Sequence, residues 1–98
     1  MKQMQVPEEM VVKVNYDDTN IPAAAREFKP VLYRDGDSFC CLLGEDPQAG
    51  IFGCGESPKA AIKDWDNHFQ ERLQSHSQDD ELVQYIEDSR KFSKKKVQ

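Results

Sequence analysis

Residues 28–73 read FKPVLYRDGDSFCCLLGEDPQAGIFGCGESPKAAIKDWDNHFQERL, and this stretch decides the fold. Two apolar runs flank the turn Arg34-Asp35-Gly36-Asp37, and a glycine-rich run follows at residues 50–54. An amphipathic stretch from Pro58 completes the unit. The order strand, strand, strand, helix is typical of an α+β unit in which a helix covers one face of a small sheet. We therefore expect an α+β fold with a small antiparallel sheet of three to four strands, one main amphipathic helix packed on it and a C-terminal helix.

The first two strands are predicted at residues 29–34 and 38–43, joined by Asp35-Gly36-Asp37, because Asp-Gly adopts hairpin-turn conformations at little cost. Along the second strand the apolar side chains occupy both faces: Phe39, Cys41 and Leu43 on one, Cys40 and Leu42 on the other. This pattern predicts a central strand that is covered on both sides. The main helix can cover only one face, so we expect the C-terminal helix or another subunit to cover the second.

The helix prediction is the strongest in the chain. Ser57 is a good N-cap and Pro58 suits the first helical position. The apolar residues that follow recur at three- and four-residue steps, which indicates one buried face on a helix from Pro58 to Gln74; they are Ala61, Ile62, Trp65, Phe69 and Leu73. Gly53 and Gly55, at the exit of the third strand, indicate a tight bend or a close approach of another segment.

The flanking segments are less regular. Residues 1–8 are expected to be loose, whereas residues 10–16 alternate and predict a half-buried strand. Residues 21–28 could form a short helical turn capped by Asn20 or a loop. A second helix should open at residues 79–81 and fray from Ser89. One domain is therefore expected at residues 1–75, with its core at 28–73, followed by a C-terminal helix and basic tail at 76–98.

The overall composition predicts a cytoplasmic protein without a membrane span. The chain has 98 residues, of which 38% are hydrophobic and 32% charged. No stretch approaches the roughly 20 apolar residues of a transmembrane helix, and the N-terminal residues lack the apolar core of a secretory signal. Three cysteines is an odd number, and the adjacent Cys40 and Cys41 should point to opposite faces of a strand. We expect all three to be reduced thiols.

Charge is unevenly distributed. Residues 1–89 carry a net charge of −10 and residues 90–98 carry +5, which gives the −5 of the whole chain. The acidic part should repel nucleic acid and favour a basic partner. Only the tail could attract nucleic acid, through Arg90, Lys91, Lys94, Lys95 and Lys96.

The sequence predicts no catalytic residues, no cofactor site and no metal site. His68 and His76 are the only histidines, eight residues apart, and no cysteine pair has the Cys-x-x-Cys spacing of zinc ligands. Asp35, Asp37, Glu45 and Asp46 occupy turns, where carboxylates usually stabilise the turn itself. The alternative is a metal-dependent nuclease, which would need such acids to converge on one pocket.

The arrangement resembles the N-terminal domain of HicB-like antitoxins across about half of the chain. Three motifs carry the resemblance: the acidic turn at residues 34–37, the acid-proline loop that ends at Pro47, and the helix entry at residues 55–62. The resemblance implies a partial ribonuclease-H-like sheet that has lost catalysis and binds a small basic toxin-like protein. It also implies dimers or larger assemblies. The acidic turn residues Asp35, Asp37, Glu45 and Asp46 are the candidate partner contacts.

The chain departs from that family in two respects. A strand and linker at residues 10–27 precede the matching segment, and only about 25 residues follow it, too few for the DNA-binding domain that most members carry. A second resemblance, to a double-stranded-RNA-binding domain, comes from Gly53, Gly55, Ser57 and Lys59 before the helix. The acids on that helix argue against RNA binding. We also expect a homodimer with the C-terminal helix at or near its interface.

Overall fold

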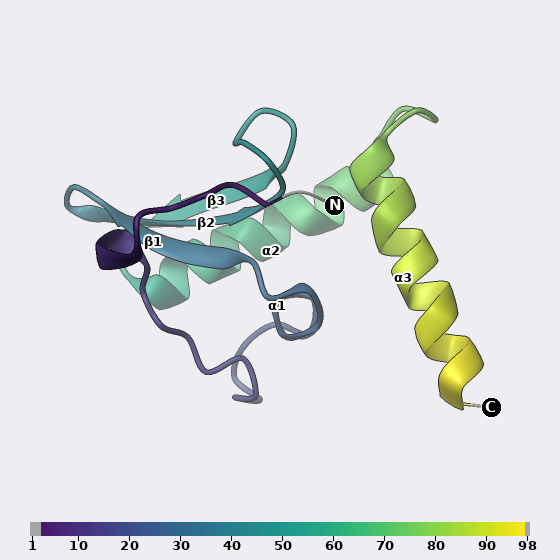
Figure 1. Cartoon of the computed structure of the whole chain (residues 1–98), viewed down its shortest axis with the longest axis horizontal. Coiled ribbons are helices and arrows are strands. Elements are labelled where there is room, and N and C mark those ends of the chain that lie inside the picture. Colours follow the sequence, from purple (N-terminus) through teal and green to yellow (C-terminus); the bar gives the residue numbers. More distant parts are fainter. Residues whose placement is uncertain (1–2, 98) are drawn as a thin grey trace.

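The structure is a computed structural model that describes the backbone of residues 3–97 and the side chains of residues 3–91. Its sheet has three antiparallel strands in the order β1-β2-β3. The main helix lies across one face of this sheet, and two further helices pack beside it (Figure 1). The expected α+β fold is confirmed. The elements are a 3-10 turn η1 (Glu8–Met10), α1 (Ala23–Phe28), β1 (Val31–Asp35), β2 (Ser38–Leu43), β3 (Ile51–Gly55), α2 (Pro58–Gln74) and α3 (Glu81–Val97).

Helix α2 has the predicted bounds, cap and buried face. The Ser57 hydroxyl accepts a hydrogen bond from the Ala60 backbone N–H at 3.1 Å, and Pro58 opens the helix. Ile62, Trp65 and Phe69 are buried in the main core. That core lies between α2 and the sheet and also includes Leu32, Cys41, Leu43 and Ile51.

The close approach predicted at the glycines of β3 is made by α2. A Cβ atom added to Gly53 would lie 2.2 Å from the backbone nitrogen of Trp65, and one added to Gly55 would lie 2.6 Å from the Ala60 Cβ. The helix therefore rests directly on the backbone of β3, a packing distance that only glycine permits.

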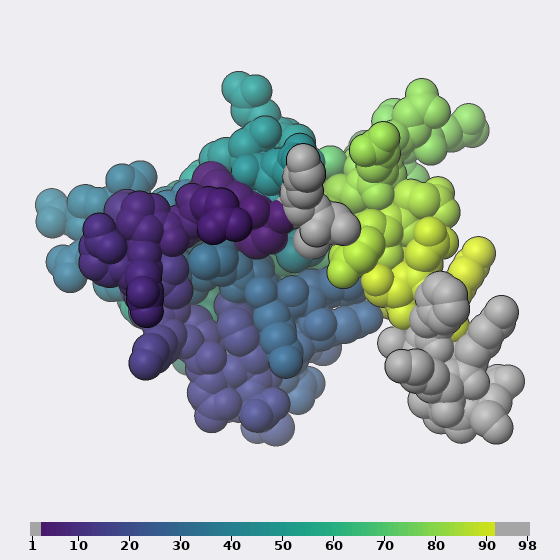
Figure 2. Space-filling view, in the orientation of Figure 1, coloured from purple at the N-terminus to yellow at the C-terminus, as the bar shows by residue number. Residues whose placement is uncertain are grey.

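The second face of the sheet is covered by the N-terminal segment, residues 3–10. Its side chains Met4, Val6 and Met10 pack against a cluster formed by Tyr33, Cys40 and Leu42. Figure 2 shows this segment in purple, spread over the strands. We expected residues 1–8 to be loose and the C-terminal helix or another subunit to cover this face, whereas residues 3–10 of the same chain lie on it.

Hydrogen bonds fix the N-terminal segment to the end of β2. The Met4 N–H donates to the Gly44 carbonyl at 2.8 Å, and the Gln3 side-chain amide donates to the Leu42 carbonyl at 3.0 Å. The Gly44 N–H donates back to Gln3 Oε1 at 2.9 Å. These partners lie about 40 positions apart in the chain, so the local sequence does not predict the contact.

The strand predicted at residues 10–16 does not form. Only one isolated bridge, between Val11 and Tyr33, joins this stretch to β1, together with a hydrogen bond from the Val12 N–H to the Leu32 carbonyl at 2.8 Å. The chain crosses the edge of β1 here: Met10 packs on the second face, while Val12, Val14 and Tyr16 pack against the main core. The predicted alternation is present, but a segment that passes from one face to the other cannot follow β1 along its length.

The sequence left either a short helical turn or a loop open for residues 21–28, and residues 23–28 form a helix. Pro22, rather than Asn20, precedes the first helical residue of α1, and no side chain caps it. The helix ends at Lys29, which adopts the left-handed conformation with φ of 50°. Ala24 and Ala25 are buried, and this short helix packs at the edge of the main core.

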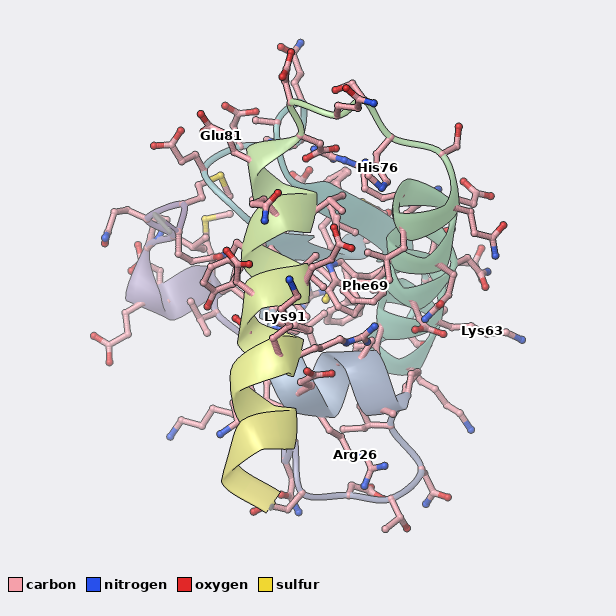
Figure 3. The ribbon with its side chains drawn as sticks, turned by 90° about the vertical axis from the view of Figure 1, so that its right-hand side faces the viewer. Arg26, Lys63, Phe69, His76, Glu81 and Lys91 are labelled. Atoms are coloured by element: carbon pink, nitrogen blue, oxygen red, sulfur yellow. A yellow bond between two sulfur atoms is a disulfide. The ribbon has the colours of Figure 1, made fainter. Side chains whose placement is uncertain are left out.

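Helix α3 continues well beyond the expected fraying point at Ser89. Leu82 and Ile86 enter the main core, and Phe69 of α2 lies between the two helices (Figure 3). Arg90 extends the contact, because its guanidinium lies 5.4 Å from the ring centroid of Phe69 and its Nε lies 3.4 Å from a carboxylate oxygen of Glu27. These contacts hold the helix at Arg90, one residue past Ser89. The side chains of Lys94, Lys95 and Lys96 lie outside the described residues.

Candidate functional site

The four acids singled out from the sequence do not form one site. Asp35 and Asp37 flank the β1–β2 turn, whereas Glu45 and Asp46 lie in the loop after β2. The six residues of β2 separate the two pairs, a span of roughly 20 Å at the rise of a strand. The acids therefore do not converge as a two-metal centre requires.

Hydrogen bonds within each loop hold both acidic turns in place. Asp46 Oδ1 accepts hydrogen bonds from the backbone N–H groups of Gln48 and Ala49, at 2.8 and 2.7 Å. At the β1–β2 turn, Gly36 has a φ of 61°, and the Arg34 Nε donates to the Gly36 carbonyl at 3.2 Å. Glu45, one of these acids, lines a cavity.

That cavity is a cleft of about 680 Å³ between the β2–β3 loop and the start of α3. Its volume falls within the usual range for ligand sites. One wall comes from the β2–β3 loop, and the other comes from the end of α2, the following turn and the first residues of α3. We call it the acidic cleft, and its lining residues are Gly44, Glu45, Ala49, Arg72, Ser77, Asp80, Glu81, Leu82 and Tyr85.

Arg72 joins the two walls of the acidic cleft. Its Nε and Nη2 donate to the two carboxylate oxygens of Asp80 at 2.6 and 3.1 Å. Its Nη1 and Nη2 also donate to the carbonyl oxygens of Gly50 and Ala49, at 3.0 and 2.9 Å. The guanidinium therefore ties α2 to the β2–β3 loop and to the start of α3, and its fixed fork suits this bidentate pairing.

Asp80 serves as the cap of α3 at the same time. Its Oδ1 accepts hydrogen bonds from the backbone N–H groups of Leu82 and Val83, at 3.1 and 3.2 Å. The hydrogen bond from Arg72 lowers the pKa of Asp80 below its ordinary value, and the backbone hydrogen bonds add to this effect against the opposing effect of burial. Asp80 is thus held as a carboxylate whose charge Arg72 offsets.

The remaining carboxylates give the acidic cleft its charge. Glu45 and Glu81 are exposed, and the ion pairs of the described residues include neither of them. Figure 3 shows Glu81 at the N-terminal end of α3. Tyr85, one helical turn further on, is 38% exposed. The cleft thus combines two free carboxylates with an exposed aromatic ring, which are groups that attract a cation.

Arg72 is the residue that sequence reasoning missed. The sequence assigned no role to it, and its partner Asp80 was predicted only as part of the opening of the next helix. The sequence did contain a signal for this pair. Only a short polar break separates an arginine in the last turn of one helix from an aspartate that can serve as N-cap of the next helix, and such a break can bring the two side chains together. Glu45 lines the cleft, and its role as a partner contact stays a prediction from the sequence.

Two of the cysteines are not reduced thiols as expected. Cys40 and Cys54 lie directly opposite each other on β2 and β3, with Cα atoms 4.1 Å apart, and a disulfide joins them. Cys41 points to the opposite face from its neighbour Cys40, as predicted, and is a free thiol. Burial raises the pKa of the Cys41 thiol to about 12, which makes it a poor nucleophile.

The Nδ1 atoms of His68 and His76 lie within hydrogen-bond distance of backbone carbonyl oxygens. His68 Nδ1 bonds to the Phe52 carbonyl oxygen, and Asp64 Oδ2 accepts a hydrogen bond from the Cys54 N–H at 3.0 Å. These α2 side chains therefore bind backbone groups at the edge of β3 that does not pair with β2. Within residues 3–91, no three histidine, cysteine, aspartate or glutamate side chains gather closely enough to hold a metal ion.

The basic tail differs from the sequence prediction in one respect. Arg90 was grouped with the tail lysines as a possible nucleic-acid contact, but its guanidinium packs over Phe28 and Phe69 and pairs with Glu27. It contributes to the docking of α3. In the part of the chain that the structure describes, no helix has both the length and the apolar character needed to cross a membrane.

Comparison with known protein families, curated proteins and solved structures finds no match to this chain.

Proposed function

We propose that this chain is a non-catalytic protein-interaction module of the HicB-like type, which binds a basic protein partner. The observation that carries the proposal is the acidic cleft, where Glu45 and Glu81 are free to bind a cation because Asp80 already neutralises Arg72. A lysine or arginine of the partner would meet two carboxylates and the ring of Tyr85. Complementary charge of this kind accelerates encounter and selects among partners.

The order of the elements supports the resemblance to HicB-like antitoxins. Three antiparallel strands lead into one helix that covers a face of the sheet, and an acidic turn joins the first two strands. After α2 comes a second helix, α3, at the place where those domains usually have a further strand. The proposal therefore takes from the resemblance the binding of a small basic toxin-like protein, and leaves DNA binding aside.

Charge reversal in the acidic cleft tests the proposal. We expect Glu45→Lys/Glu81→Lys to weaken binding of a fluorescein-labelled arginine-rich peptide at least about tenfold, measured by fluorescence anisotropy. The matched control is Glu56→Lys/Glu87→Lys, which makes the same change in net charge at exposed residues outside the cleft. Equal weakening by both variants would mean that the peptide responds to net charge alone, and the cleft would be rejected as its site.

A nuclease assay addresses the alternative function. Purified protein should leave RNA and DNA intact in the presence of Mg²⁺ or Mn²⁺. Degradation that Asp35→Asn or Asp37→Asn abolishes would establish a metal-dependent nuclease and refute the non-catalytic module.

A homodimer with α3 at or near the interface is the second part of the proposal. Its support is that α3 packs on the body through Leu82 and Ile86 and leaves its opposite side, which includes Gln84 and Asp88, exposed. Such surface can be buried between two copies of a small chain. Light scattering on the full-length protein across a range of concentrations should give twice the mass of one chain, and a constant single-chain mass would refute it.

We also place the protein in the cytoplasm as part of this proposal. Cytosolic thiol systems reduce most disulfides, so the Cys40–Cys54 disulfide would persist there only while an oxidant maintains it. Alkylation of rapidly acid-quenched cells, followed by mass spectrometry, would measure the fraction in each form. A pair that is fully oxidised in growing cells would instead point to an oxidising compartment.

A further inference from the structure

A second hollow lies at the other end of α2 and has the opposite charge. It is a groove of about 670 Å³ between the loop of residues 13–22 and the first half of α2. Its floor is apolar and includes Val14, Ile21 and Ile62. Ile62 is only 5% exposed, so the floor is continuous with the main core. We call it the basic groove.

Three lysines line the basic groove: Lys13 from the loop, and Lys59 and Lys63 from α2. All three are exposed, and the ion pairs of the described residues include none of them. Figure 3 shows Lys63 projecting from α2 on the side away from α3. One third of the nine lysines and arginines at residues 3–91 therefore line one groove of an acidic chain.

The two acids of the groove compensate these lysines only in part. Asp18 Oδ1 accepts a hydrogen bond from the Asn20 N–H at 2.9 Å, and Asp66 Oδ1 contacts the side-chain amide of Gln70 at 3.4 Å. The loop is further closed by a hydrogen bond from the Ile21 N–H to the Asp18 carbonyl at 3.1 Å. The two hydrogen bonds to Asp18 preform the loop wall, which lowers the cost of ordering it when a ligand binds.

From this arrangement we propose that the basic groove binds an acidic peptide segment of another protein, in which aliphatic residues alternate with carboxylates. The aliphatic side chains would cover the half-buried Val14 and Ile21, and the carboxylates would meet the lysines. Lys59 and Lys63 are one helical turn apart, a rise of about 6 Å, which is close to the roughly 6.8 Å between alternate residues of an extended peptide. Their flexible stems allow the ammonium groups to reach carboxylates above an apolar floor.

The net negative charge of the whole chain does not prevent such binding. At physiological ionic strength the screening length is about 8 Å. A peptide in the groove therefore responds mainly to the nearby lysines, while carboxylates elsewhere on the body are screened. The proposal adds a second surface to the proposed function, at the opposite end of α2 from the acidic cleft, and the two can be tested apart.

Fluorescence anisotropy with a labelled peptide of alternating glutamate and leucine tests the groove. Lys59→Glu/Lys63→Glu should weaken its binding at least about tenfold, because two attractive contacts become repulsive. The matched control, Lys29→Glu/Lys91→Glu, makes the same change in net charge outside the groove and should bind as the parent does. Thermal melts verify that each variant is folded. Equal weakening by the control, or no binding by the parent, would overturn the proposal.

Two further probes test the chemistry of the occupant. A peptide in which serine replaces each leucine should lose most of the affinity, and equal binding would show that the apolar floor plays no part and overturn the proposal. Decanoate should compete only weakly; competition as strong as that of the unlabelled peptide would identify a small-molecule site instead. The arginine-rich peptide should bind Lys59→Glu/Lys63→Glu as it binds the parent, so failure of the groove and failure of the acidic cleft are distinguishable.

Discussion

Arg72 and Asp80 face each other across the turn between α2 and α3, with Nε and Oδ2 2.6 Å apart. Both residues also hold backbone groups: Arg72 binds the β2–β3 loop, and Asp80 caps α3. The side chain of Asp80 is only 10% exposed. The pair therefore belongs to the class of partly desolvated, bidentate contacts, which contribute more than exposed ion pairs do.

Substitutions at Asp80 should separate its two roles. Asparagine is as good an N-cap as aspartate but carries no charge, so Asp80→Asn removes the ion pair and keeps the cap. Asp80→Ala removes both and should lower the free energy of unfolding by about 1 kcal/mol more than Asp80→Asn does. Urea denaturation measures both values. Asp79→Ala is the control and should change stability by less than about 0.5 kcal/mol.

Acid should weaken the same contact. Because the folded pKa of Asp80 is lowered, its ionised form stabilises the fold above the unfolded pKa of about 3.9. That contribution is lost as the pH falls through the lower, folded pKa. The difference in melting temperature between the parent and Asp80→Asn should therefore be largest near neutral pH and shrink below about pH 4. A difference that stays constant down to strongly acid pH would contradict the lowered pKa.

Gly53→Ala should be among the most damaging single substitutions. The added methyl group would lie 2.2 Å from the Trp65 nitrogen, so α2 would have to move away from β3. Forcing atoms into a packed core costs about 1–3 kcal/mol and sometimes more. The control is Gly36→Asn: nothing lies within 4 Å of the position of its Cβ, and asparagine tolerates the positive φ. If chemical denaturation finds the two variants equally stable, the close packing of α2 on β3 is wrong.

Trp65→Ala should lower the free energy of unfolding by about 3–5 kcal/mol, because it empties a fully buried site. The indole N–H is buried without a hydrogen-bond partner among the described residues. Trp65→Phe should therefore cost less, since it removes an unsatisfied donor and leaves a smaller cavity. Tyr85→Ala is the exposed-aromatic control. Thermal melts in which Trp65→Ala matches Tyr85→Ala would show that the tryptophan is not in the core.

Reduction of the Cys40–Cys54 disulfide should lower the free energy of unfolding by about 2–4 kcal/mol. Cys40→Ala/Cys54→Ala should show the same stability with and without reductant, which controls for effects of the reductant itself. Cys41 should resist iodoacetamide in the folded protein, because it is buried and its thiol has a raised pKa of about 12. Mass spectrometry of the native and the urea-unfolded protein would detect this difference, and rapid labelling of native Cys41 would refute its burial.

The elements that sequence reasoning placed well are those with local signals. The cap at Ser57 and the apolar spacing from Ile62 to Phe69 involve residues within a few turns of one another, and α2 has the predicted bounds. The hairpin turn at Gly36 likewise placed β2 correctly. In both cases the residues that carry the signal are also the residues that form the structure.

The features that were missed depend on distant parts of the chain. Docking of the N-terminal segment requires Gln3 to meet Gly44, and the disulfide requires the register that sets Cys40 opposite Cys54. The alternation at residues 10–16 revealed which side chains would be buried, but it could not distinguish a strand from an extended segment that crosses a sheet edge. At the site, Glu45 was identified as a loop acid, whereas the role of Arg72 depends on the angle between two helices.

The position of the N-terminal segment has a consequence for the order in which the chain can fold. During synthesis, Met4 and Val6 leave the ribosome before the strands on which they rest. Their binding surface includes Leu42, Phe52 and Cys54, so it is complete only when β3 has followed. Until then these side chains and one face of the growing hairpin are open to other chains and to chaperones, so residues that are made before the sheet are enclosed only after it has formed.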